Sequence, residues 1–311
     1  MKRDLTFVSH GTDCAAWHLR AANDALAGPG GRPCLVMAHG FGGTRDSGLL
    51  AYGEPFAEAG FDAFIFDYRG FGSSDGMPRL DVSVRRQRQD YRSALAAARR
   101  LPGVDPARIG LWGTSYSGGH AVVVAAQDRQ VSAVVALTPA MDGLATLARL
   151  VRHAGIGPLS RLAGHGLRDA VRGLSGRPPH LVPIVGAPGS PAMMSSPGAD
   201  GIVATTGPTW RNEVRARAAL KVGFNRPVTA AARLSCPLLI QLGTRDRVAP
   251  PSAARRTARL AGAGAELCAY PVDHFDVYDG PWQRQALADQ LHFLRRTLAP
   301  LRTPGGGTPS K

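Results

Sequence analysis

The sequence predicts an α/β fold: a mostly parallel, doubly wound sheet with an inserted segment that is largely helical. Short apolar runs of strand length, such as residues 34–38, 62–67 and 131–137, alternate with longer amphipathic stretches. Strands that alternate with helices favour a parallel sheet covered on both faces. Over residues 141–232 this alternation stops, and helical patches are separated by Pro- and Gly-rich loops. The pattern therefore predicts one core interrupted by an insertion.

The first half of the chain supplies most of the expected strands. Polar and apolar residues alternate on either side of the turn His10-Gly11-Thr12-Asp13, which is typical of a strand pair at 4–9 and 14–19. Gly60 is a typical stop after a helix. Further strands are expected at 34–38, 62–67, 109–112 and 131–137, and helices at 49–59, 82–100 and from 121 onwards.

The last part of the chain returns to the alternation, with strands expected at 238–243 and 266–270 and helices at 252–261 and 282–298. The core is thus assigned to residues 1–140 and 233–298. The insertion, 141–232, is expected to form a lid over the carboxyl ends of the strands, where open α/β sheets bind ligands. Its helical patches are expected at 144–153, 159–174 and 210–222, and the Gly- and Pro-rich tail 299–311 is expected to be disordered.

Charge and composition argue against several kinds of binding partner for this protein. The formal net charge is +14, yet lysine occurs only at Lys2, Lys221 and Lys311, and the arginines follow no recognition-helix or zinc-finger pattern. We therefore expect no nucleic-acid partner. The N-terminus has no apolar core long enough for a signal peptide, and no apolar stretch has the length of a membrane span, so a cytoplasmic protein without a membrane partner is expected. Phosphate-loop, dinucleotide and metal-binding spacings are absent, so no cofactor and no metal are expected; a homodimer is left open.

Residues 109–120 carry the strongest chemical signal. A buried strand, Ile109 to Trp112, leads into Gly113-Thr114-Ser115-Tyr116-Ser117-Gly118, and an apolar helix follows. This is the strand–turn–helix context of a nucleophile elbow, in which Ser115 sits on a sharp, strained turn. Small residues are needed on both sides of the serine, and the chain has Gly113 and Ser117 there, one step from G-x-S-x-G.

A serine nucleophile needs a base and a group that orients the base. In this kind of sheet the order along the chain is Ser, then Asp or Glu, then His. Asp246 follows the strand 238–243, and His274 follows the strand 266–270, so both are expected at the edge of the sheet that holds Ser115. Asp142, on the loop after the strand 131–137, is the alternative acid.

The oxyanion formed during acyl transfer needs two backbone N–H donors. One is expected from Tyr116, the residue after the nucleophile. The other is expected from Phe41 in His39-Gly40-Phe41-Gly42, because glycines on both sides let the backbone approach a substrate. His39 is interpreted as a supporting residue rather than the base.

These motifs resemble those of the α/β-hydrolase superfamily over residues of about 1–140 and 233–298. Within it the chain is similar to dienelactone-hydrolase-like and X-Pro-peptidase-like enzymes. Dienelactone hydrolases proper use cysteine at the elbow, whereas this chain has Ser115, and the dehalogenase and epoxide-hydrolase branches use aspartate there. The motifs that carry the resemblance are His39-Gly40-Phe41-Gly42, Asp67-Tyr68-Arg69-Gly70-Phe71-Gly72-Ser73-Ser74, Gly113-Thr114-Ser115-Tyr116-Ser117-Gly118, Gly243-Thr244-Arg245-Asp246 and Asp273-His274-Phe275.

The resemblance implies acyl transfer to water through an acyl-serine. We expect an esterase that acts on a small-molecule substrate with a short or medium acyl group. Met193, Met194 and Trp210 are the candidate substrate-binding residues of the insertion, with Leu181, Val182 and Ile184 as further apolar candidates. An acyltransferase, a thioesterase or a peptidase with the same triad remains an alternative, as does a ligand-binding protein of this fold without catalytic activity.

Overall fold

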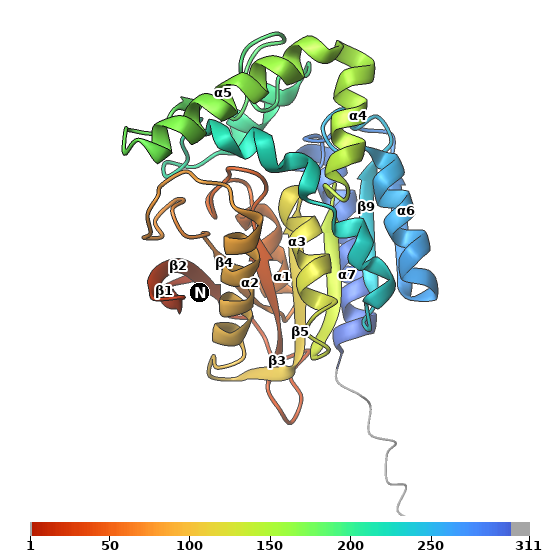
Figure 1. Ribbon diagram of the computed structural model, residues 1–311. Helices are drawn as coiled ribbons and strands as arrows, with labels where there is room; N and C mark the ends of the chain where they lie inside the picture. Colours follow the sequence, from red (N-terminus) through yellow and green to blue (C-terminus); the bar gives the residue numbers. More distant parts are fainter. Residues whose placement is uncertain (1, 300–311) are drawn as a thin grey trace, which may run out of the picture.

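A computed structural model describes residues 2–299 and contains a central sheet of eight strands flanked by helices (Figure 1). Across the sheet the order is β1-β2-β4-β3-β5-β6-β9-β10. The strands are β1 (Lys2–Ser9), β2 (Thr12–Leu19), β3 (Arg32–Ala38), β4 (Asp62–Phe66), β5 (Val104–Thr114), β6 (Val131–Leu137), β9 (Leu238–Gly243) and β10 (Ala265–Tyr270).

The sheet is mostly parallel. Only β1 pairs antiparallel with β2, and β2 antiparallel with β4; the pairs from β4 to β10 are all parallel. The central strands are buried along their whole length, because both faces of the sheet are covered. The predicted α/β fold class is thereby confirmed.

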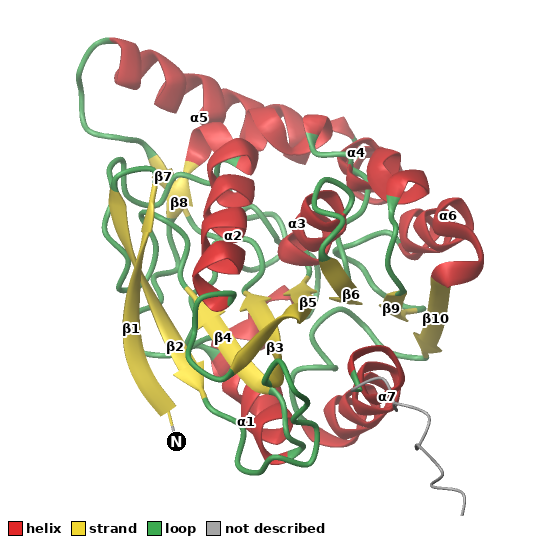
Figure 2. Cartoon of the chain, turned by 90° about the horizontal axis from the view of Figure 1, so that it is seen from below, coloured by secondary structure: helices red, strands yellow, loops and turns green. Residues whose placement is uncertain are grey.

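Helices cover both faces of the sheet (Figure 2). One face carries α2 (Val84–Ala98), α3 (Tyr116–Ala125) and α6 (Pro251–Ala261). The other carries α1 (Leu50–Glu58) and α7 (Gly280–Leu298). The two apolar cores, one on each face, include Tyr91 and Val122 on the first and Phe56 and Phe293 on the second.

The order of the strands reverses beside β3. The chain runs from β3 outward to β4 and then crosses back to β5 on the other side of β3. In the parallel register Ala38 lies beside Gly113, so the loops after β3 and β5 leave the sheet next to each other. Such a switch point opens a crevice at the carboxyl ends of the strands.

The insertion lies over those carboxyl ends (Figure 1). It contains α4 (Gly143–Ala154), α5 (Ile156–Leu174) and a two-stranded pair of β7 (Leu181–Val182) and β8 (Val214–Arg215). The expected helix at 210–222 is only partly found: Trp210 closes a turn, and the helix starts later, as the 3₁₀ helix Ala216–Phe224. Further 3₁₀ helices are Ala199–Thr205, Pro227–Arg233 and, outside the insertion, Gly262–Gly264.

Apart from Ala299, the predicted disordered tail lies outside the described residues. In the part of the chain that is described, no helix is both long enough and apolar enough to cross a lipid bilayer.

Candidate active site

Ser115 sits on a strained turn between β5 and α3. Its φ of 53° and ψ of −116° place it in a region that residues other than glycine rarely adopt. A Cβ on Gly113 would lie 2.2 Å from the carbonyl oxygen of Ser117, so only glycine fits at that position. The tight turn holds the Ser115 side chain at the start of α3, clear of the sheet.

Ser117, the departure from G-x-S-x-G, has a role of its own in the turn. Its hydroxyl donates to the carbonyl oxygen of His39 and lies 2.6 Å from the hydroxyl of Tyr68. Because a hydroxyl has a single proton, the Tyr68 hydroxyl is the donor in the second bond. Ser117 therefore ties the elbow to the loop after β3.

The structure brings the three predicted site residues together. His274 Nε2 lies 3.0 Å from Ser115 Oγ, and His274 Nδ1 lies 2.7 Å from Asp246 Oδ2. The other Asp246 oxygen accepts backbone hydrogen bonds from Val248 (2.8 Å) and Ala249 (2.7 Å), which fixes the carboxylate. All three side chains are buried, so the hydrogen bonds are shielded from water.

The register of two neighbouring strands explains why Asp246 and His274 meet. Gly243, the last residue of β9, lies beside Tyr270, the last residue of β10. The two loops that follow therefore start together, and the Thr244 amide donates to the Tyr270 carbonyl at 2.7 Å.

Asp142, the alternative acid, lies elsewhere. Its Oδ1 accepts from the Leu144 amide at 3.0 Å and thereby caps α4. Both carboxylate oxygens also accept from Arg226, each at 3.1 Å. The geometry gives Asp246, and not Asp142, the contact with His274.

The two predicted oxyanion donors face the same region. A Cβ on Gly40 would lie 3.1 Å from Ser115 Cβ, so the loop that carries Phe41 passes directly beside the serine. The Tyr116 amide belongs to the first turn of α3, where N–H groups have no acceptor within the helix. The rings of Phe41 and Tyr116 meet edge to face, with centroids 5.4 Å apart.

His39 supports this loop. Its ring packs edge to face against Tyr68, and its Nδ1 lies 3.0 Å from the Gly40 carbonyl oxygen. Burial lowers the pKa of His39 to about 4, so the ring is neutral at neutral pH and Nδ1 is the donor. No hydrogen bond joins His39 to Ser115 within residues 2–299.

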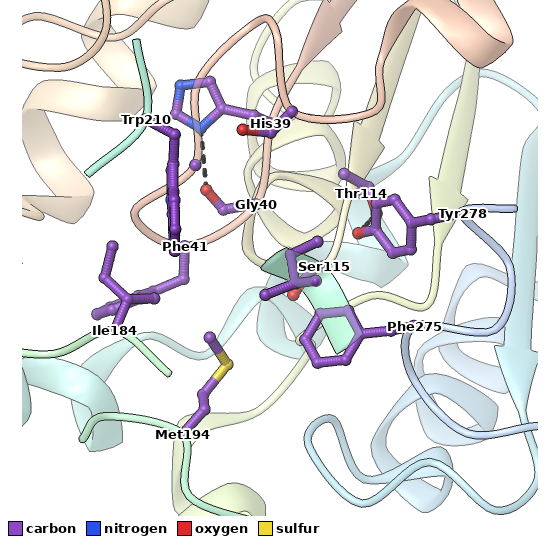
Figure 3. A pocket seen from close by; sticks show the side chains of 13 residues that line it. His39, Gly40, Phe41, Thr114, Ser115, Ile184, Met194, Trp210, Phe275 and Tyr278 are labelled. Carbon is purple, nitrogen blue, oxygen red and sulfur yellow. Dashed lines mark hydrogen bonds between the residues drawn. The ribbon is translucent and has the colours of Figure 1, made fainter. Parts of the chain in front are cut away.

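An apolar cavity of about 40 Å³ lies beside Ser115 (Figure 3). In Figure 3, Phe41 and Ile184 lie on one side of the serine, and Phe275 and Tyr278 lie on the other. Met194 appears between Ile184 and Phe275 in this view. Trp210 also lines the cavity, and its indole N–H donates to the Gly42 carbonyl at 3.1 Å. Of the apolar candidates, Met194, Ile184 and Trp210 line this cavity, whereas Leu181 and Val182 belong to the β7–β8 pair.

A second cavity, of about 90 Å³, shares Phe41 and Ser115 with the first and is also lined by Met193 and Asn225. Arg88 lies behind it and donates to Asn225 Oδ1 at 2.7 Å and to His120 Nδ1 at 3.3 Å. Burial lowers the pKa of the Arg88 guanidinium. Sequence reasoning missed Arg88 and Asn225, because nothing in the pattern of the helix 82–100 sets Arg88 apart from its other arginines.

Tyr278 and Phe275, two further cavity residues, were also missed. The Tyr278 hydroxyl is hydrogen-bonded to the Thr114 hydroxyl, one residue before the nucleophile. Both residues follow His274 on the loop after β10, and this closeness in sequence could have indicated that they lie at the site. Within residues 2–299, no group of three or more His, Cys, Asp and Glu side chains is arranged to hold a metal ion.

Residues 30–272 match the family described as serine aminopeptidase, S33. The chain belongs to this family. Its members share the α/β-hydrolase fold, which agrees with the sheet and the elbow described above.

Within the wider group of α/β hydrolases, several relatives are similar in sequence. The quorum-quenching protein AidA of Acinetobacter baumannii is 33% identical over 300 residues, which is 95% of each chain. The thiohydrolase aneE of Aspergillus aculeatus is 39% identical over 110 residues, 35% of each chain. The polyketide transferase grgF of a Penicillium species is 32% identical over 158 residues, 51% of each chain.

Solved structures show the same fold. DcsB, in complex with a substrate analogue, has a TM-score of 0.82 at 21% identity over 96% of this chain and all of that one. The α/β hydrolase GrgF from Penicillium has a TM-score of 0.79 at 24% identity over 96% and 99% of the two chains. At this level of identity the likeness concerns the fold alone.

Proposed function

We propose that the protein is a serine hydrolase that cleaves carboxylic esters with a short or medium acyl group through an acyl-serine intermediate. The observation that carries the proposal is the buried chain of contacts from Ser115 Oγ to His274 and on to Asp246, at 3.0 Å and 2.7 Å, on a strained elbow. A purely structural serine would not need this backbone strain or a histidine aligned with its hydroxyl.

In the acylation step Ser115 Oγ attacks the ester carbonyl carbon while His274 Nε2 takes the serine proton. Asp246 keeps the proton of His274 on Nδ1 and stabilises the positive charge that forms on the ring. The carbonyl oxygen becomes an oxyanion, which the Phe41 and Tyr116 amides would stabilise by hydrogen bonds. The intermediate then collapses: the ester C–O bond breaks, and His274 gives its proton to the leaving alcohol.

In the deacylation step a water molecule attacks the acyl-serine, and His274 again takes the proton. The second tetrahedral intermediate uses the same two amide donors. When it breaks down, the proton returns to Ser115 and the carboxylic acid leaves. The apolar cavity beside Ser115 would hold the acyl group, and the insertion would act as a lid that limits access of water.

The relatives support acyl chemistry and extend the range of substrates. Two of them are named a thiohydrolase and a polyketide transferase, so a thioester as substrate and an acyl acceptor other than water are the second candidates. The family description includes a peptidase. The narrower placement near dienelactone-hydrolase-like enzymes stays a prediction.

A fluorophosphonate probe tests the proposal, because it reacts with serines that are activated as nucleophiles. We expect labelling of the native protein at Ser115, turnover of acetyl and butyryl esters, and neither in Ser115→Ala. Loss of such a nucleophile costs on the order of 10⁶-fold in kcat. A protein that folds, as judged by circular dichroism, but neither takes up the probe nor cleaves any ester would instead be a ligand-binding member of the fold.

A further inference from the structure

A third cavity, of about 470 Å³, extends outward from the candidate active site. It lies between α4, α5, residues 188–197 and the loop after β9. It shares four lining residues with the second cavity, which reaches Ser115: Thr146, Met193, Met194 and Val248. The two cavities therefore adjoin, and a substrate held at Ser115 can extend from one into the other.

The charged side chains that line this third cavity are arginines, so its lining is positively charged. Arg149 and His153 lie one turn apart on α4, Arg161 comes from α5, and Arg247 comes from the loop that also carries Asp246. No aspartate or glutamate lines the cavity. Three guanidinium groups from three separate parts of the fold thus surround one hollow.

These arginines are largely free of internal partners. Within residues 2–299, Arg149 and Arg161 take part in no ion pair, and the Arg161 side chain donates to the Gly189 carbonyl at 3.2 Å. Arg247 lies 3.5 Å from Asp273 in a partly exposed pair, and its Nη1 donates to the Pro197 carbonyl at 3.5 Å. An ion pair of this length at the surface contributes little in water. Arg161 and Arg247 are exposed and Arg149 is half-buried, whereas the buried Arg32 is paired with Asp62 at 2.7 Å. The positive charge in the cavity is therefore available to a ligand.

We propose that this basic cavity binds an anionic group, a carboxylate or a phosphate, on the alcohol or thiol part of the substrate. The inference rests on the proposed acyl chemistry at Ser115 and specifies its substrate class. Guanidinium groups bind both kinds of anion through paired, charge-assisted hydrogen bonds. The first cavity supports this orientation of the substrate, because it is apolar, has no arginine in its lining and is only about 40 Å³ in volume, which suits the acyl group.

Two matched pairs of butyrate esters test the proposal and separate the two anions. The first pair is the ester of 4-hydroxybutanoate and that of its neutral amide. The second is the ester of butanediol monophosphate and that of butanediol itself. We expect the charged member of at least one pair to be cleaved with a kcat/KM about tenfold higher, as charge-assisted hydrogen bonds allow. The pair with the larger ratio identifies the anion.

Arginine variants then assign the effect to the cavity. In the triple variant Arg149→Met, Arg161→Met, Arg247→Met the preference for the anionic ester should disappear, while turnover of the neutral ester stays. Arg152→Met is the matched control, because Arg152 lies on the same helix, is exposed and does not line the cavity. About 1 M NaCl should also remove the preference, since salt screens exposed charges.

The outcomes separate this inference from the proposed function. If the neutral esters are cleaved but neither anionic ester is preferred, the inference is wrong and the esterase proposal stands. If no ester is cleaved at all, binding to Ser115→Ala decides: calorimetry should show tighter binding of an anionic ester than of its neutral partner, lost in the triple arginine variant. Equal binding of the two would overturn the anion site.

Discussion

The hydroxyl groups of Ser117 and Tyr68 lie 2.6 Å apart, and Ser117 is two residues after the candidate nucleophile. The Ser117 hydroxyl donates a hydrogen bond to the His39 carbonyl, so these two bonds join the elbow, the loop after β4 and the loop after β3. Tyr68 is fully buried and packs edge to face against His39. The second serine of the motif thus holds the nucleophile and the Phe41 loop in a fixed relationship.

Replacing Ser117 should therefore cost stability. Ser117→Ala leaves the Tyr68 hydroxyl and the His39 carbonyl buried without this partner, which we expect to lower the free energy of unfolding by about 1–3 kcal/mol in urea. Tyr68→Phe removes the orphaned hydroxyl, so the double variant should cost less than the sum of the two single ones. Additive losses would show that the two hydroxyls do not interact in solution.

The two candidate acids can be separated by matched substitutions. Asp246→Asn keeps a side-chain oxygen for the Val248 and Ala249 amides but loses the carboxylate that orients His274, so kcat should fall by about 10³–10⁴-fold. Asp142→Asn should leave kcat within a few-fold, because Asp142 contacts Arg226 and not His274. Initial rates with one neutral ester are sufficient; the reverse ranking would exclude Asp246 as the acid.

The apolar cavity should set the length of the acyl chain. Met194→Ala or Ile184→Ala enlarges it and should raise the ratio of kcat/KM for octanoyl over acetyl esters, by about tenfold or more. Of these two residues only Ile184 is confined to this cavity, because Met194 also lines the outer two. Met193 lines the outer two cavities and not the first, so Met193→Ala should alter the preference for the alcohol part instead. Leu167→Ala, at an exposed position of α5, serves as the control. An unchanged chain-length profile in both cavity variants would contradict the assignment.

His39 should make stability depend on pH. Burial lowers its pKa to about 4, whereas an unfolded chain takes up this proton near pH 6.5. The unfolded state thus binds more protons between these values, so stability is present above about pH 6.5 and is lost as the pH falls toward 4, by about 3 kcal/mol. His39→Gln cannot titrate, and its urea unfolding at pH 7 and pH 4.5 should differ less than that of the native protein. Equal differences would mean that His39 is accessible to protons in the fold.

The sheet could be predicted because its strands carry their own signal. Strands buried on both faces appear as continuous apolar runs bounded by turn residues. Once the strands are assigned along the chain, Asp246 falls on the loop after β9 and His274 on the loop after β10, and these two parallel strands are neighbours in the sheet. Sequence reasoning placed these residues at the same edge of the sheet as Ser115, and the structure shows them in contact.

The insertion was harder to predict, because its structure depends on contacts far apart in the chain. Trp210 was expected in a helix, but its position is set by a hydrogen bond to Gly42 in the core. Met193 and Met194 are neighbours in sequence yet line partly different cavities, since Met194 also forms a β-bridge with Val185. The hydrogen bonds of Ser117 were missed for a similar reason: the motif shows that the residue is small but not what its hydroxyl meets.

The pairing of Asp142 with Arg226 brings the two ends of the insertion to one place. Next to this ion pair the Gly143 amide donates to the Asn225 carbonyl at 2.8 Å, and the Val228 amide to the Met141 carbonyl at 2.9 Å. Residues 143–225 therefore leave and re-enter the core through a narrow stem. A segment attached in this way can be exchanged as a unit, provided that a graft from a relative matches the stem and keeps the contacts of Trp210 with Gly42 and of Thr209 with Asp46. Chimaeras joined at this stem offer a direct route to new substrate preferences on an unchanged catalytic core.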